Sequence, residues 1–195
     1  MSKGRLEAFS DGVIAIIITI MVLELKMPHG GDFDSLRQIV PSFVCYLISF
    51  VYVGIYWNNH HHLLHLVKHV DAKVMWANMH LLFWLSLIPV ATGWIGDHPY
   101  AAPPTALYAF VMFMSGIAYL LLQTAIVAHH GRDSALAREL GGDFKGKVSG
   151  LSYLGAIGLA FVNHWLSVAI FVGIAILWFI PDSRLSRTAH GSESH

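Results

Sequence analysis

Long apolar runs separated by short polar segments dominate the pattern of this chain. A helix needs about 20 apolar residues to cross a bilayer, and four runs reach that length. The last apolar region, Val148–Ile180, is too long for one span and carries Asn163-His164 in its middle, so it predicts a hairpin of two short helices. The pattern therefore predicts an all-α integral membrane protein with six transmembrane helices. The four single predicted spans are Leu6–Met27, Leu36–Trp57, Val74–Ile95 and Pro104–Val127.

The distribution of positive charge favours six spans over five. With six spans, ten of the 12 Lys and Arg residues lie on the side of the N-terminus, and only Lys26 and Arg37 lie on the other side. Because cytoplasmic loops are enriched in Lys and Arg, both termini are expected in the cytoplasm. A five-span topology would export Arg184 and Arg187. We expect residues 1–182 to form one six-helix transmembrane unit and residues 183–195 to form a short polar cytoplasmic tail.

Composition narrows the class of protein further. Hydrophobic residues make up 55% of the chain and charged residues 12%, about half the charged share of a soluble protein. Membrane lipids are therefore expected partners. The net charge is zero and no basic block exceeds two residues, so nucleic acid is not an expected partner. With a single cysteine, Cys45, the chain has no intrachain disulfide.

The first predicted span carries a carboxylate, Asp11, near its start. On a helix, Asp11 points about 140° away from Ile16. A charge costs roughly 2.5–3.5 kcal/mol at the bilayer centre, so we expect Asp11 to face protein partners or water, either as a structural tie or in transport. The candidate partners on the same side of the membrane are Arg5, Asn58, Asn59, His60, His61 and Asn78.

A stripe of mostly apolar side chains runs along a different face of this span. Such a stripe is either a surface packed on protein or lipid, or the lining of a pore, and helical spacing alone does not separate these alternatives. Its members are Gly12, Ile16, Thr19, Ile20, Leu23 and Met27.

The segment from Arg5 to Ile16 has the pattern R-x-x-x-F-S-D-G-V-x-A-I. This pattern resembles the signature of the transmembrane protein 175 family, which comprises endolysosomal potassium channels and their prokaryotic homologues. Further matches are Tyr56-Trp57 with His60-His61, and the segment from Asn78 to Trp94. The resemblance covers the first three predicted spans well and the six-span plan throughout.

This resemblance implies a homotetrameric cation channel in which the first helix of each subunit lines a central pore. It implies an apolar constriction at Ile16, with Ile20 and Leu23 as further rings and the Thr19 hydroxyl one turn above. The permeant ion would be potassium among other monovalent cations, without a cofactor or an enzymatic activity. A prokaryotic inner membrane is the simplest location. The motif network that would anchor the first helix comprises Arg5, Phe9, Ser10, Asp11, His60, His61 and Asn78.

The chain has no Thr-Val-Gly-Tyr-Gly loop, so the carbonyl filter of ordinary potassium channels is absent. An apolar constriction instead opposes an ion by requiring it to lose part of its hydration shell. Potassium holds water less tightly than sodium does. We therefore expect a moderate preference for potassium.

Histidines after the second predicted span raise a different class of function. His61, His65 and His69 are spaced i, i+4 and i+8, a usable though weak metal-ligand pattern. One alternative is therefore a membrane-embedded metal-dependent enzyme, although the H-x-x-H-H boxes of such enzymes are missing. Another alternative is a secondary transporter, which would usually show ionisable groups at the midplane and paired repeats; neither is evident here.

Overall fold

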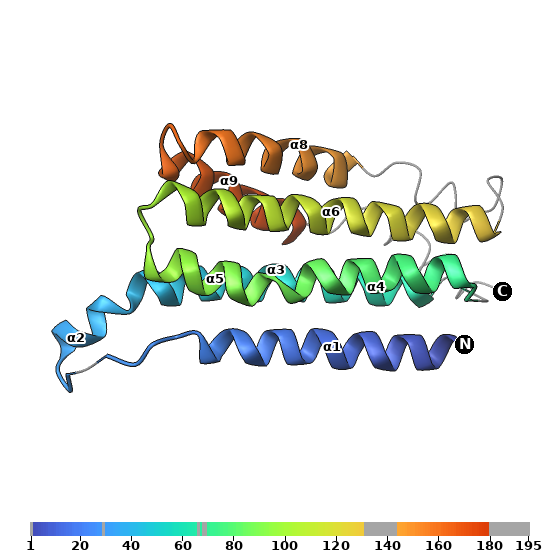
Figure 1. Ribbon diagram of the computed structural model, residues 1–195, viewed down its shortest axis with the longest axis horizontal. Coiled ribbons are helices and arrows are strands. Elements are labelled where there is room, and N and C mark those ends of the chain that lie inside the picture. The colour runs from blue at the N-terminus through green and yellow to red at the C-terminus, as the bar shows by residue number, and fades with distance from the viewer. Residues whose placement is uncertain (1, 29, 66, 68–69, 131–143, 180–195) are drawn as a thin grey trace, which may run out of the picture.

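The structure is a computed structural model that describes residues 2–28, 30–65, 67, 70–130 and 144–179. Its regular elements are α-helices, and the long ones lie side by side along the length of the molecule (Figure 1). The all-α prediction is confirmed. The helices are α1 (Lys3–Leu23), α2 (Phe33–Gln38), α3 (Val40–His65), α4 (Ala72–Ser86), α5 (Ile88–Asp97), α6 (Ala102–His130), α8 (Phe144–Leu159) and α9 (His164–Phe179).

The helices form a layered bundle with α1 at one edge. Helix α1 packs against α3, α4 and α5, whereas α6 packs against α4, α5, α8 and α9. In Figure 1, α1 lies along the bottom, α8 lies along the top, and α3 to α6 lie between them. The first helix is thus attached to its subunit on one side only.

Within the part of the chain that the structure describes, four segments are long and apolar enough to cross a membrane: Lys3–Leu23, Val40–His65, Ala72–Asp97 and Ala102–Ala128. They correspond to the four single spans predicted from the sequence. Helix α9 is apolar but shorter. At 1.5 Å per residue, the 16 residues of α8 or of α9 extend about 24 Å. The four long apolar segments make the chain a multi-pass membrane protein.

The third membrane segment is divided, whereas the sequence pattern predicts one continuous span. Helix α4 ends at Ser86 and α5 begins at Ile88, with Pro89 in the first turn of α5. Proline has no backbone N–H and therefore cannot bond to the carbonyl four residues earlier. The break places Asn78 and Thr92 on separate helices.

The chain turns back at residues 160–163, between α8 and α9. The side-chain carbonyl of Asn163 accepts a hydrogen bond of 3.0 Å from the backbone N–H of Trp165, near the start of α9. The hairpin predicted at Asn163-His164 is therefore found there. The boundary predicted at residue 182 and the tail 183–195 lie outside the described residues.

The structure adds a short helix, α2, that the sequence pattern does not predict. Asp32 caps its N-terminus by accepting a 2.7 Å hydrogen bond from the backbone N–H of Ser35. That bond stabilises the ionised carboxylate and lowers the pKa of Asp32 below its ordinary value.

Candidate functional site

Helix α1 has a buried face and an exposed face. The buried side chains point toward α3, α4 and α5 and include Ser10, which is fully buried. On the other face, the exposed fraction is 57% for Ile16, 41% for Ile20 and 79% for Leu23, and Thr19 is exposed beside them. The stripe selected from helical spacing therefore lies on the face that the subunit leaves uncovered. The buried residues of α1 are Leu6, Ser10, Ile14, Ile17 and Met21.

A buried chain of hydrogen bonds links three helices through Asn78 of α4. The Asn78 amide nitrogen donates to the hydroxyl oxygen of Ser10 on α1 over 2.9 Å. The Asn78 amide oxygen lies 2.6 Å from Nε2 of His60 on α3. All three side chains are at most 1% exposed. Three of the predicted motif residues therefore come together in the core.

Hydrogen-bond chemistry determines the direction of this chain. The Ser10 hydroxyl also donates to the Leu6 carbonyl over 2.8 Å, so its oxygen is the acceptor for the Asn78 N–H. The Asn78 oxygen is then the group that faces His60, which requires a hydrogen on Nε2 of that ring. Removing any member leaves a buried partner unpaired, which is costly.

Asp11 takes part in a second, more exposed contact. Its carboxylate accepts a 3.0 Å hydrogen bond from the indole N–H of Trp57 on α3. The Trp57 ring in turn stacks on His61, with ring centroids 6.0 Å apart and planes 26° apart. The sequence does not point to Trp57 as a partner of Asp11, because a tryptophan at a span end is typical of a membrane-interface anchor. Its position beside the motif residues His60-His61 was the available signal.

Two predicted motif residues are not joined to these contacts. The side chains of Arg5 and Phe9 are exposed. On a helix, Phe9 lies seven residues before Ile16 and therefore shares its face. Lys3 instead contacts α3, because its Nζ donates to the carbonyl of His65 over 2.8 Å. A cation there complements the C-terminal end of that helix.

The metal-site hypothesis gains no support from the described residues. Among them, no three His, Cys, Asp or Glu side chains gather closely enough to hold a metal ion. The rings of His61 and His65 have centroids 6.2 Å apart, and His69 lies outside the described residues.

A second buried polar cluster lies toward the other end of α3. The Ser49 hydroxyl lies 2.8 Å from the Thr92 hydroxyl and 3.0 Å from the Tyr108 hydroxyl. These residues connect α3, α5 and α6. Near the same end, Lys26 and Asp97 form an exposed ion pair between the segment after α1 and α5.

Comparison with known proteins identifies the family. The family model described as "Endosomal/lysosomal potassium channel TMEM175" matches residues 5–89. A potassium channel from Chryseobacterium is 49% identical over 188 residues, which cover 96% of this chain and 98% of that protein. The human endosomal/lysosomal proton channel TMEM175 is 31% identical over 156 residues, covering 66% of this chain but 29% of the human protein.

The fold is also that of a solved relative. The crystal structure of a lysosomal potassium-selective channel TMEM175 homologue from Chamaesiphon minutus matches with a TM-score of 0.77 and 31% identity. The match covers 91% of this chain and 96% of the chain in that crystal structure. These relatives are channels rather than enzymes, which removes the metal-dependent enzyme as an alternative. Shared sequence over nearly the whole length, together with a shared fold, shows that this chain belongs to the TMEM175 family of potassium channels.

Proposed function

We propose that this protein is a potassium-preferring cation channel whose pore is lined by the exposed face of α1. The observation that supports this proposal is the contrast between the two faces of that helix. One face is buried and bonded to α3 and α4 through Ser10, whereas the other presents Ile16, Thr19, Ile20 and Leu23. A helix attached on one side only is available to face a shared axis.

The pore requires several copies of the chain, because one helix cannot enclose a channel. Closed rotational symmetry would bring the same face of α1 from each subunit to the axis. We propose a homotetramer, the assembly that the family resemblance implies. Four Ile16 side chains would then form an apolar ring, and Ile20 and Leu23 would form further rings toward the other end of α1.

An apolar ring selects by dehydration. Such a constriction excludes water, so an ion must lose part of its shell to cross. Potassium loses water at lower cost than sodium does and would therefore pass more readily. The Thr19 hydroxyl donates to the Ile16 carbonyl over 2.9 Å, which leaves the hydroxyl oxygen as an acceptor. That oxygen would replace one of the lost water ligands.

We further propose six transmembrane helices, with α8 and α9 as the short final pair. The protein would lie in a prokaryotic inner membrane. Both termini would face the cytoplasm, because this topology places ten of the 12 Lys and Arg residues on the cytoplasmic side. The secondary-transporter alternative gains no support from the described residues.

The substitution Ile16→Asn tests the pore assignment. A polar side chain would hydrate the ring, so potassium flux into liposomes should rise several-fold and the preference over sodium should fall. Val22→Asn is the matched control, because Val22 is also exposed on α1 but points about 120° away from Ile16. Equal flux from wild type and Ile16→Asn would refute the assignment.

Light scattering of the purified protein should give the mass of four chains plus detergent, and another mass would refute the tetramer.

A further inference from the structure

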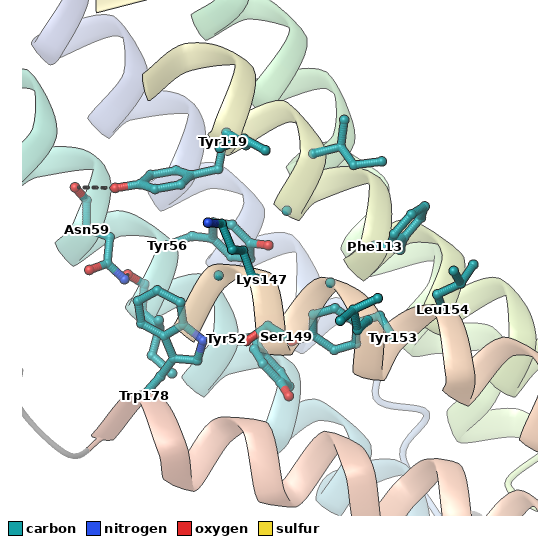
Figure 2. Close-up of a pocket in the computed structure, with 17 residues that line it drawn as sticks. Tyr52, Tyr56, Asn59, Phe113, Tyr119, Lys147, Ser149, Tyr153, Leu154 and Trp178 are labelled. Atoms are coloured by element: carbon teal, nitrogen blue, oxygen red, sulfur yellow. Dashed lines mark hydrogen bonds between the residues drawn. The ribbon is translucent and has the colours of Figure 1, made fainter. Parts of the chain in front are cut away.

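A cavity of about 520 Å³ lies between α3, α6, α8 and α9, away from the exposed face of α1. Its volume falls within the range of roughly 300–1,000 Å³ that is usual for ligand sites. Figure 2 shows aromatic side chains from several helices around it, among them Tyr56 of α3, Tyr119 of α6 and Trp178 of α9. None of the contacts described above for α1 involves this cavity.

The polar groups in the cavity wall are largely bonded to the protein itself. The Tyr119 hydroxyl donates to the backbone carbonyl of Asn59 over 3.1 Å, the dashed bond in Figure 2. The Trp178 indole N–H donates to the Ser149 hydroxyl over 3.0 Å. The Tyr52 hydroxyl donates to a backbone carbonyl of α9. These bonds leave ring faces and aliphatic carbons toward the cavity, so its occupant is expected to be apolar.

One charged side chain, Lys147, also lines the cavity. It is exposed and lies in the first turn of α8, close to Lys145, whose Nζ is 6.0 Å from the centre of the Trp178 ring. Among the described residues, the ion pairs join Lys3, Lys26 and Arg37 to carboxylates, and Lys147 is in none of them. The cavity thus has apolar walls and an ammonium group at one end.

We propose that this cavity binds an anionic glycerophospholipid, with an acyl chain among the aromatic side chains and the phosphate beside Lys147. Apolar walls and a single cation match a molecule with a long hydrocarbon chain and a charged head. Free phosphate lacks the hydrocarbon part. On the topology proposed above, Lys147 lies on the cytoplasmic side, and the lipid would come from that leaflet. Lipid at this position would bridge α3 to the outer helices α6, α8 and α9.

Native mass spectrometry of the detergent-solubilised oligomer tests this site without measuring ion flux, so its outcome is separate from that of the channel proposal. The protein is titrated with phosphatidylglycerol, with phosphatidylcholine and with inorganic phosphate. Wild type should bind one phosphatidylglycerol per subunit. One cation near the lipid surface corresponds to about a fivefold preference over phosphatidylcholine. Inorganic phosphate should not bind.

Two variants locate the lipid. Gly150 lines the cavity, and a Cβ there would meet nothing within 4 Å, so Gly150→Leu fills the space without displacing backbone. Displacing two methylenes of the acyl chain weakens binding by roughly tenfold. Lys147→Gln should abolish the preference for phosphatidylglycerol. It alters an exposed side chain and therefore leaves folding intact.

Matched controls lie outside the cavity. Gly155→Leu makes the same change on α8, at an exposed position with equal room, and Lys73→Gln removes an exposed cation of α4. Both should bind lipid as wild type does. Absence of bound phospholipid in wild type, or equal binding by Gly150→Leu and Gly155→Leu, would overturn the site. An unchanged preference in Lys147→Gln would overturn the choice of an anionic lipid.

Discussion

The Ser10 hydroxyl offers a sharp test of how α1 is held in its orientation. Ser10→Ala removes the acceptor of the Asn78 N–H and leaves that buried donor unpaired, at a cost of about 1–3 kcal/mol. Hydrogen bonds between helices in membranes average roughly 0.6 kcal/mol and reach about 1.7 kcal/mol. We therefore expect a loss of about 1–2 kcal/mol. For a chain of this length, that loss lowers the melting temperature by roughly 2–8 °C.

The assay is thermal unfolding of the purified protein, followed by tryptophan fluorescence. Ser115→Ala is the control, because Ser115 is equally buried and donates to the carbonyl four residues earlier, as Ser10 does. No described bond ties its hydroxyl to another helix, so Ser115→Ala should lower the melting temperature less than Ser10→Ala does. In a double-mutant cycle, Ser10→Ala should cost little once Asn78→Leu is present. Equal melting temperatures for Ser10→Ala and Ser115→Ala would refute the anchoring role.

Other contacts give smaller, separable effects. Trp57→Phe keeps a ring but removes the donor to Asp11, so unfolding in detergent should show a loss of about 1 kcal/mol; a loss near zero would make the bond incidental. Lys26→Ala should cost at most about 1 kcal/mol, and melting curves at 1 M salt should no longer separate it from wild type. The folded-state pKa of Asp32 lies below its ordinary value, so its cap is present above that ordinary value and is lost as pH falls through the lowered pKa. As the pH falls through the lowered pKa, hydrogen exchange of the Ser35 backbone amide should accelerate relative to that of other amides. Asp32→Asn, which still caps the helix, should remove this pH dependence.

The sequence predicted the division of α1 into two faces because helical spacing and hydrophobicity are local properties. It placed Asp11 away from Ile16, and the structure bonds Asp11 to α3 while leaving Ile16 exposed. The carboxylate's partner was not predictable in the same way. The indole N–H of Trp57 reaches Asp11 across 46 positions of the sequence, and only the packing of α1 on α3 determines which α3 side chain is within reach.

The ends of the helices were likewise not predictable from hydrophobicity alone. The length of an apolar run predicts how much of a helix lies in lipid. On that basis the second predicted span ends at Trp57. Helix α3 continues for two more turns to His65, because polar residues extend a helix as readily as apolar ones outside the membrane. The apolar run of the third span masked its division near Pro89, since proline interrupts hydrogen bonding without interrupting hydrophobicity.

The one-sided attachment of α1 determines which parts of the subunit set the orientation of that helix. The family model matches residues 5–89, which comprise α1 from Arg5 onward, α2, α3, α4 and the first residues of α5. Helices α6, α8 and α9 pack chiefly on α3 to α5 and on one another. The matched residues therefore contain α1 and most of the structure that holds it, and a change in α6, α8 or α9 reaches the first helix chiefly through α3, α4 and α5.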